Sequence, residues 1–149
     1  MPLSAGSGPS SLDAFEGYYT APATHCSMQD GDVTRPCDPP EEDCLLIKRV
    51  DDTHAAIKLQ SIQSHGHECG VAGVAELKDG RLVYVDANPA SPESGKGIAL
   101  RLDGRKLKIA YLEKPDKDAA PFCGLKARLD WLVFALADRQ PVGAHQCGP

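Results

Sequence analysis

The sequence has few aromatic residues and no long apolar run. Phe, Tyr and Trp make up 5% of the 149 residues, so aliphatic side chains must supply most of the core. No apolar stretch approaches the roughly 18 residues that a membrane-spanning helix needs. Basic residues are also in deficit, with 16 Lys and Arg against 21 Asp and Glu and a net charge of −5. This balance argues against a general nucleic-acid binder, because such proteins neutralise phosphates with basic side chains.

The motifs of common enzyme classes are missing as well. The chain has no Gly-x-Ser-x-Gly, no His-Glu-x-x-His and no glycine loop in a strand–loop–helix context that would cradle a phosphate. The carboxylate pairs Asp51-Asp52 and Glu41-Glu42 are typical of solvated turns. We therefore expect a protein that is not an enzyme and that needs no cofactor.

Six cysteines are scattered along the chain without a Cys-x-x-Cys pair. Structural zinc sites usually have close ligand pairs, so this spacing predicts disulfides and an oxidising compartment. We expect Cys69 to pair with Cys123, since each lies at the edge of a strand pattern. Within one loop, Cys26 is expected to pair with Cys37 or Cys44. Cys147 is a candidate for a free thiol or an intermolecular bond.

The ends of the chain differ in composition from its middle. Residues 1–12 are rich in Gly, Ser and Pro and are expected to be disordered, residues 13–140 to form one domain, and residues 141–149 to form a tail. The first ten residues have neither the basic start nor the apolar stretch of a signal peptide. The cysteines nevertheless favour a periplasmic, surface or secreted protein, with Met1 standing where a signal was removed.

Short turn motifs between alternating apolar and polar segments predict three hairpins. Asp79-Gly80 and Asp103-Gly104 are strong hairpin signals, because both central positions of a type I′ turn require positive φ. Asp51-Asp52 is a weaker signal for a hairpin turn of the same kind. The strand pairs predicted in this way are Leu45–Val50 with Thr53–Ile62, Val71–Lys78 with Arg81–Asp86, and Ile98–Leu102 with Arg105–Leu112.

Two further segments complete the predicted sheet. Gly17–Thr20 is a short first strand, and Leu125–Phe134 is an eighth, although its apolar residues also fit a C-terminal helix. Alternating positions such as Leu107, Ile109 and Tyr111 give each strand one buried face. An antiparallel meander of seven or eight strands leaves exposed edges, which closure into a small barrel removes. The predicted fold is therefore an all-β, disulfide-linked barrel, with Trp131 in its core.

Two surfaces are candidates for binding another protein. Asp86–Lys96 is longer than a hairpin needs, and Ser94 and Lys96 stand in it between glycines, so we expect both to project toward a partner. The second candidate is acidic: residues 1–44 have a charge balance of −7, against +2 for residues 45–149. Three acidic residues are consecutive in this region, Glu41, Glu42 and Asp43, and their negative charge would steer a basic partner toward it.

Two other functions are open from the residues alone. His65, His67 and Cys69 would share one face of a strand and are types that bind zinc or copper, which would make a metal-binding module. A barrel with few aromatic residues can also enclose a small apolar ligand. Its cavity would be lined by the residues that face inward on two strands: Leu100, Leu102, Leu107 and Ile109.

Five short motifs follow one another along residues 17–134: Gly17-Tyr18-Tyr19, Cys44-Leu45-Leu46-Ile47, Gly80-Arg81-Leu82-Val83-Tyr84, Leu107-Lys108-Ile109 and Cys123-Gly124-x-x-Ala127-x-Leu129. In this order they resemble small exported bacterial barrels associated with the lysozyme-inhibitor families of Gram-negative bacteria. The resemblance implies a periplasmic or lipid-anchored barrel that plugs the cleft of a muramidase with a loop. Inhibitors of c-type lysozyme carry a Ser-Gly loop motif that is followed by an aromatic residue. Ser94-Gly95 matches the Ser-Gly pair, but the aromatic residue is missing from this chain.

Together these observations predict an exported, non-enzymatic protein that binds another protein. A basic cell-wall hydrolase is the first candidate partner, since lysozymes are often basic and the N-terminal third of this chain is acidic. Binding would be steric, with a loop held by the barrel filling the partner's cleft.

Overall fold

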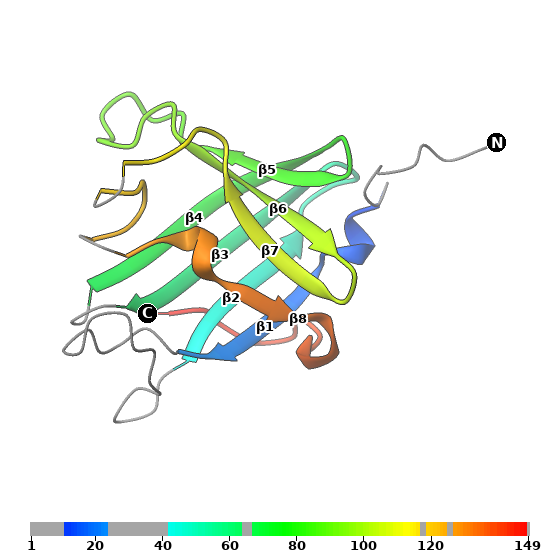
Figure 1. The fold of residues 1–149 in the computed structure, drawn as a ribbon. Coiled ribbons are helices and arrows are strands. Elements are labelled where there is room, and N and C mark those ends of the chain that lie inside the picture. Colours follow the sequence, from blue (N-terminus) through cyan, green and yellow to red (C-terminus); the bar gives the residue numbers. More distant parts are fainter. Residues whose placement is uncertain (1–10, 24–41, 64–66, 117–118, 125–126, 149) are drawn as a thin grey trace.

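The structure, a computed structural model, describes residues 11–23, 42–63, 67–116, 119–124 and 127–148. These residues form antiparallel strands and short 3-10 helices, without an α-helix among them (Figure 1). The strands are β1 (Gly17–Pro22), β2 (Glu42–Arg49), β3 (His54–Gln63), β4 (His67–Lys78), β5 (Arg81–Val85), β6 (Gly97–Asp103), β7 (Lys106–Tyr111) and β8 (Val133–Ala135). The 3-10 helices are η1 (Leu12–Ala14), η3 (Leu129–Trp131) and η4 (Leu136–Asp138).

Each strand pairs with the next along the chain, so the sheet order is β1 to β8. The sheet then curls until its two ends meet. Tyr18 on β1 and Gln140, just after η4, exchange N–H···O bonds of 2.8 and 2.9 Å. The prediction of an all-β, up-and-down barrel is confirmed, and this bridge nearly closes it.

The hairpin turns agree with the sequence in part. Asp79 and Gly80 have φ values of +51° and +76°, as a type I′ turn requires. In the next hairpin Asp103 pairs with Lys106, so the two-residue turn is Gly104-Arg105 rather than Asp103-Gly104. Only glycine is at positive φ there, because Asp103 remains in the strand.

The barrel interior is filled by side chains. The predicted inward positions of β3, β6 and β7 are buried, including Ile57, Leu100 and Leu107. Three aromatic side chains, Phe15, Tyr19 and Phe134, are fully buried among these aliphatic residues. Leu12, which ends the segment expected to be disordered, is also part of this core.

The predicted eighth strand, Leu125–Phe134, is wrong in its bounds, and the alternative of an α-helix is not found in the described residues. The chain makes a 3-10 turn over Leu129–Trp131, and only Val133–Ala135 pairs with β7. This turn shifts the alternation by one residue, so Leu132 and Phe134 point inward. Trp131 is therefore 40% exposed, and its expected place in the core is wrong.

Two disulfides join distant parts of the described chain. The predicted bond between Cys69 and Cys123 is confirmed. Cys44 is bonded to Cys147, which overturns both its pairing with Cys26 and the free or intermolecular state of Cys147. The remaining alternative, Cys26 with Cys37, lies outside the described residues. The C-terminal tail is thus fixed against the outside of the barrel, where the His145 ring also stacks on Tyr18 at 4.3 Å between centroids.

Candidate functional site

The up-and-down topology places the long connections at one end of the barrel. The short hairpins β2–β3, β4–β5 and β6–β7 lie at the opposite end (Figure 1). The strands β1, β3, β5 and β7 end on the side of the long connections, which we call the long-loop end, and its described connections include residues 86–96, 112–116, 119–124 and 127–132. Cys44 and Cys69 lie near the beginning of strands that start there, so both disulfides fasten this end.

The loop 86–96 at this end is organised by the carboxylate of Asp86. Its Oδ2 accepts a 2.6 Å hydrogen bond from the Ser91 hydroxyl, and its Oδ1 accepts one of 2.9 Å from the N–H of Asn88. The Ser91 hydroxyl and the Asn88 N–H, in that order, hold the pKa of Asp86 below its usual value. Asp86 is thereby ionised and bonded at neutral pH, and its carboxylate holds the first half of the loop, residues 86–91, in place.

Main-chain bonds close the same loop. The N–H of Asp86 donates to the carbonyl of Lys96 at 2.9 Å, and the N–H of Gly95 donates back to the carbonyl of Asp86 at 2.7 Å. Gly95 has a φ of +81°, which an L-residue rarely adopts, and nothing lies near the position of its missing Cβ. Ser94, Gly95 and Lys96 are exposed. The loop therefore presents the predicted residues Ser94 and Lys96 on an ordered, self-bonded support.

A second connection is clamped over the mouth of the barrel beside this loop. The buried side-chain amide of Gln63 binds the main chain of Arg128 twice, donating to its carbonyl at 2.9 Å and accepting from its N–H at 2.8 Å. The Tyr111 hydroxyl donates to the carbonyl of Pro121 and accepts from the N–H of Leu129, each at 3.0 Å. Burial raises the pKa of Tyr111 to about 12. These buried polar contacts, together with the disulfides, fix the long-loop end.

The acidic cluster expected to attract a partner is only partly formed by described residues. Glu41 lies outside them, and Glu42 is exposed where β2 begins at the long-loop end. Asp43 is only 5% exposed and accepts a hydrogen bond from the N–H of Ile62, so its carboxylate does not face a partner. Two other acids of the N-terminal third, Asp13 and Glu16, bind Arg49 near the opposite end.

The metal-binding and apolar-ligand alternatives gain no support from the geometry. Cys69 is disulfide-bonded and has no thiolate to offer, His65 lies outside the described residues, and no group of three potential ligands occurs among those described. The expected lining of an apolar cavity is part of the packed core instead. Leu100, Leu107 and Ile109 are buried there, and Leu102 packs against them.

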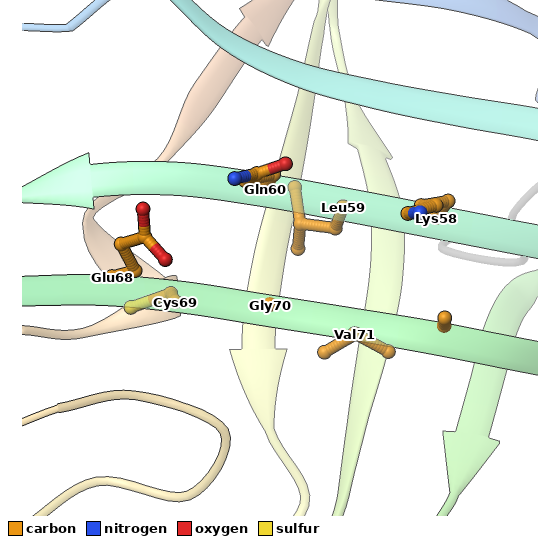
Figure 2. A pocket seen from close by; sticks show the side chains of 8 residues that line it. Lys58, Leu59, Gln60, Glu68, Cys69, Gly70 and Val71 are labelled. Atoms are coloured by element: carbon orange, nitrogen blue, oxygen red, sulfur yellow. The ribbon is translucent and has the colours of Figure 1, made fainter. Parts of the chain in front are cut away.

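A shallow hollow, which no sequence pattern predicted, lies on the outside of the barrel over β3 and β4. It has a volume of about 460 Å³, and Lys58, Gln60 and Glu68 stand beside the small residues Gly70 and Ala72 (Figure 2). Gly148 of the C-terminal tail lies against the Gln60 side chain. The hollow is therefore bordered by the segment that Cys147 anchors.

Asp86, Gln63 and Tyr111 organise the long-loop end, and this role was not predicted for any of them. Asp86, Asn88 and Ser91 are types that bond to nearby main-chain groups, so this signal was present in the sequence. Gln63 and Tyr111 act through partners 65 and 18 residues away, which no local pattern shows.

Comparisons with family models, with curated proteins and with solved structures found no match to this chain. Among the described residues, none of the helices has the length and apolar character to cross a bilayer. The two disulfides are typical of proteins in an oxidising, extracellular setting.

Proposed function

We propose that this chain is an exported, non-enzymatic protein that binds another protein through the loop 86–96. The observation that carries the proposal is the closed hydrogen-bond pattern around Asp86, which holds Ser94 and Lys96 outward at the disulfide-fastened end. Loops on rigid scaffolds commonly carry recognition. A loop that is already ordered loses less conformational entropy on binding, so more of its contact energy appears as affinity.

The mechanism is steric. The loop enters a cleft of the partner, and the barrel behind it blocks the cleft without any chemical step. Next to the loop, Val85 and Leu112 are 44% and 40% exposed and meet over Gly97, so they add an apolar contact area at its base. The first candidate partner is a basic cell-wall hydrolase of the lysozyme class, because the chain carries a net charge of −5 and opposite charges speed association.

The proposed location is the periplasm or outer surface of a bacterium, or the medium around it. Disulfide formation suits these places, and cell-wall hydrolases act there. The site residues proposed at the long-loop end are Ser94 and Lys96, with Glu42 as an acidic residue at the same end of the barrel.

Calorimetric titration of the oxidised protein with a c-type lysozyme tests the proposal, together with the rate at which that lysozyme clears a cell-wall suspension. We expect saturable binding and slower clearing by the wild type, and at least about ten-fold weaker binding by Lys96→Glu, because a contact at the centre of an interface is lost. Lys106→Glu, at the opposite end of the barrel, is the matched control and should bind as the wild type does. Equal loss in both variants, or no binding by the wild type, would overturn the assignment of this partner class.

A further inference from the structure

Four basic side chains form a row across four neighbouring strands near the short hairpins, and we call them the basic row. On β4 and β5, Lys78 is paired with Arg81. On β6 and β7, Arg101 is paired with Lys108. The register of β5 with β6, carried one residue toward the short hairpins, places Arg81 beside Arg101. Neighbouring strands lie about 5 Å apart, so the basic row is about 15 Å long.

The basic row lies on the outer surface of the barrel. Leu82, Leu100 and Leu107, each next to one of its members, are fully buried, and Leu77 packs against the core. Successive residues of a strand point to opposite faces, so the basic side chains point outward. Three of them belong to exposed residues, and the Lys108 side chain is 35% exposed.

One carboxylate lies among several of these basic side chains. Lys108 donates a 2.8 Å hydrogen bond to Asp103. This contact, followed by the charges of Arg101 and Lys106, holds the pKa of Asp103 below its usual value. A single negative charge is thus shared by three positive ones, and it does not neutralise them.

Positive charge is in excess over the whole of this face. The two segments that carry the basic row, residues 76–83 and 99–110, contain three acidic residues and six basic ones: Glu76, Asp79, Asp103, Lys78, Arg81, Arg101, Arg105, Lys106 and Lys108. Of the six basic residues, only Lys78 and Lys108 have an ion-pair partner among the residues that the structure describes. These segments therefore have a charge of +3 in a chain whose net charge is −5.

The arrangement works against the stability of the sheet. Like charges directly opposite each other on antiparallel strands are destabilising. The basic row contains two such pairs, Lys78 with Arg81 and Arg101 with Lys108. A ligand with several negative charges would remove this repulsion, so the basic row has the character of a binding surface for a polyanion.

The spacing and the residue types favour phosphate groups on a flexible chain. The guanidinium groups of Arg81 and Arg101 match the geometry of oxyanions. Positive charges about 5 Å apart lie closer together than side chains on one face of an extended peptide, which repeat about every 6.7 Å. The next row of the outer face consists of Val83, Ala99 and Ala110, and it offers no aromatic ring on which the bases of a single-stranded nucleic acid would stack.

We propose that the basic row binds a linear phosphate polymer without bases, which lies across the strands β4 to β7. Each of the four side chains would contact a phosphate group, and the repulsion between Arg101 and Lys108 would be relieved in the complex. The polymer lies near the short hairpins, at the opposite end of the barrel from the loop 86–96 (Figure 1). This site does not rest on the role proposed for Lys96.

Calorimetric titration of the oxidised full chain with inorganic polyphosphate tests the proposal. We expect saturable binding that weakens at least about ten-fold between about 50 and about 300 mM NaCl, because binding releases the counterions of the polymer. Orthophosphate at the same phosphate concentration should bind far more weakly, since one ion cannot contact the whole row. No binding of polyphosphate, or equal binding of orthophosphate, would overturn the proposal.

Protein variants locate the site. Arg101→Glu should bind polyphosphate at least about ten-fold more weakly, while its urea midpoint should not fall, because the substitution places a carboxylate opposite Lys108. Lys48→Glu makes the same charge change at an exposed residue of β2 and should bind within about two-fold of the wild type. Equal weakening in both variants, unchanged binding by Arg101→Glu or a fall in its urea midpoint would contradict the proposal.

NMR of the wild type gives a readout that needs no variant. The amides of Arg81 and Arg101 should shift when polyphosphate is added, whereas those of the loop 86–96 should not. Shifts confined to other residues would place the polymer elsewhere and overturn the proposal. Lys96→Glu should bind polyphosphate as the wild type does, so a failure of this site and a failure of the proposed lysozyme binding are separate results.

Three further ligands distinguish the occupant. Single-stranded DNA, poly-glutamate and vesicles containing anionic lipid, each matched to the polyphosphate in total charge, should bind at least about ten-fold more weakly. If one of them binds as tightly as polyphosphate and loses this binding in Arg101→Glu, the surface belongs to a nucleic acid, an acidic peptide or a membrane. That outcome would overturn the proposal.

Discussion

The side chain of Arg139 lies across Gly17, where the first and last parts of the barrel meet. A Cβ on residue 17 would stand 2.6 Å from Cγ of Arg139. The guanidinium beyond donates a 2.8 Å hydrogen bond to the carbonyl of Ala14 in η1. One residue further, Tyr18 and Gln140 make the bridge that closes the sheet. Gly17 thus gives room for the side chain that seals the barrel.

We expect Gly17→Ala to lower the free energy of unfolding by about 1–3 kcal/mol, because the added methyl group displaces Arg139. Urea unfolding of the oxidised protein measures the change. Gly70→Ala is the control, since a Cβ there meets only the carbonyl of Leu59 at 3.8 Å. A similar loss in both variants would contradict the importance given to the contact with Arg139.

Replacing Cys44 and Cys147 together by serine should lower the free energy of unfolding by about 4 kcal/mol. The disulfide spans 103 residues, and the unfolded chain without it gains the corresponding loop entropy. Chemical denaturation measures this loss. In hydrogen exchange, the amide of His145 should exchange faster as the tail is released, while the loop 86–96 keeps its protection. Slower exchange in the tail would contradict its anchoring by this bond.

Asp86→Ala should loosen the loop 86–96 and leave the barrel folded. The variant loses the acceptors of the Ser91 hydroxyl and of the Asn88 N–H, so we expect the amide of Asn88 to exchange about ten-fold faster. Amides of β3 should exchange as in the wild type, and lysozyme binding should weaken. An unchanged rate at Asn88 would show that the carboxylate does not organise the loop.

Stability should fall at alkaline pH because Tyr111 is buried. Its pKa is raised to about 12, above the ordinary value of 10.0. As the pH rises, Tyr111 therefore loses its phenolic proton in the unfolded chain before it does so in the folded protein. Its contribution to the free energy of unfolding is complete below about pH 10 and is lost as the pH rises toward 12. Urea midpoints at pH 8 and pH 11 measure the loss. Tyr111→Phe should reduce this pH dependence, and the decrease that remains includes Tyr19, whose pKa burial also raises. An equally steep decrease in Tyr111→Phe would contradict the assignment.

The architecture could be predicted from the sequence because most of its determinants are local. The alternation of apolar and polar residues along β3, β6 and β7 is visible within each short segment, and so is the turn motif Asp79-Gly80. Pairing of each strand with its neighbour then follows from the short hairpins, and closure follows from the cost of open edges.

The parts that could not be predicted depend on distant contacts. Cys44 finds Cys147 only after the barrel has brought both ends of the chain together. The 3-10 turn at Leu129–Trp131 forms where Gln63 and Tyr111 bind the main chain at its start. The turn shifts the alternation of buried residues by one position, so the predicted strand does not form there. In the candidate site, the loop 86–96 was recognised by its length, whereas the ordered placement of Ser94 and Lys96 follows from the main-chain bonds that join Asp86 to Gly95 and Lys96.

Hydrogen exchange of the oxidised protein with and without a saturating c-type lysozyme tests the central claim most directly. Binding through the long-loop end predicts that amides of the loop 86–96 become protected in the complex, while those of the hairpins at Asp79-Gly80 and Gly104-Arg105 do not change. Protection confined to these hairpins, or no change at any amide, would contradict the claim.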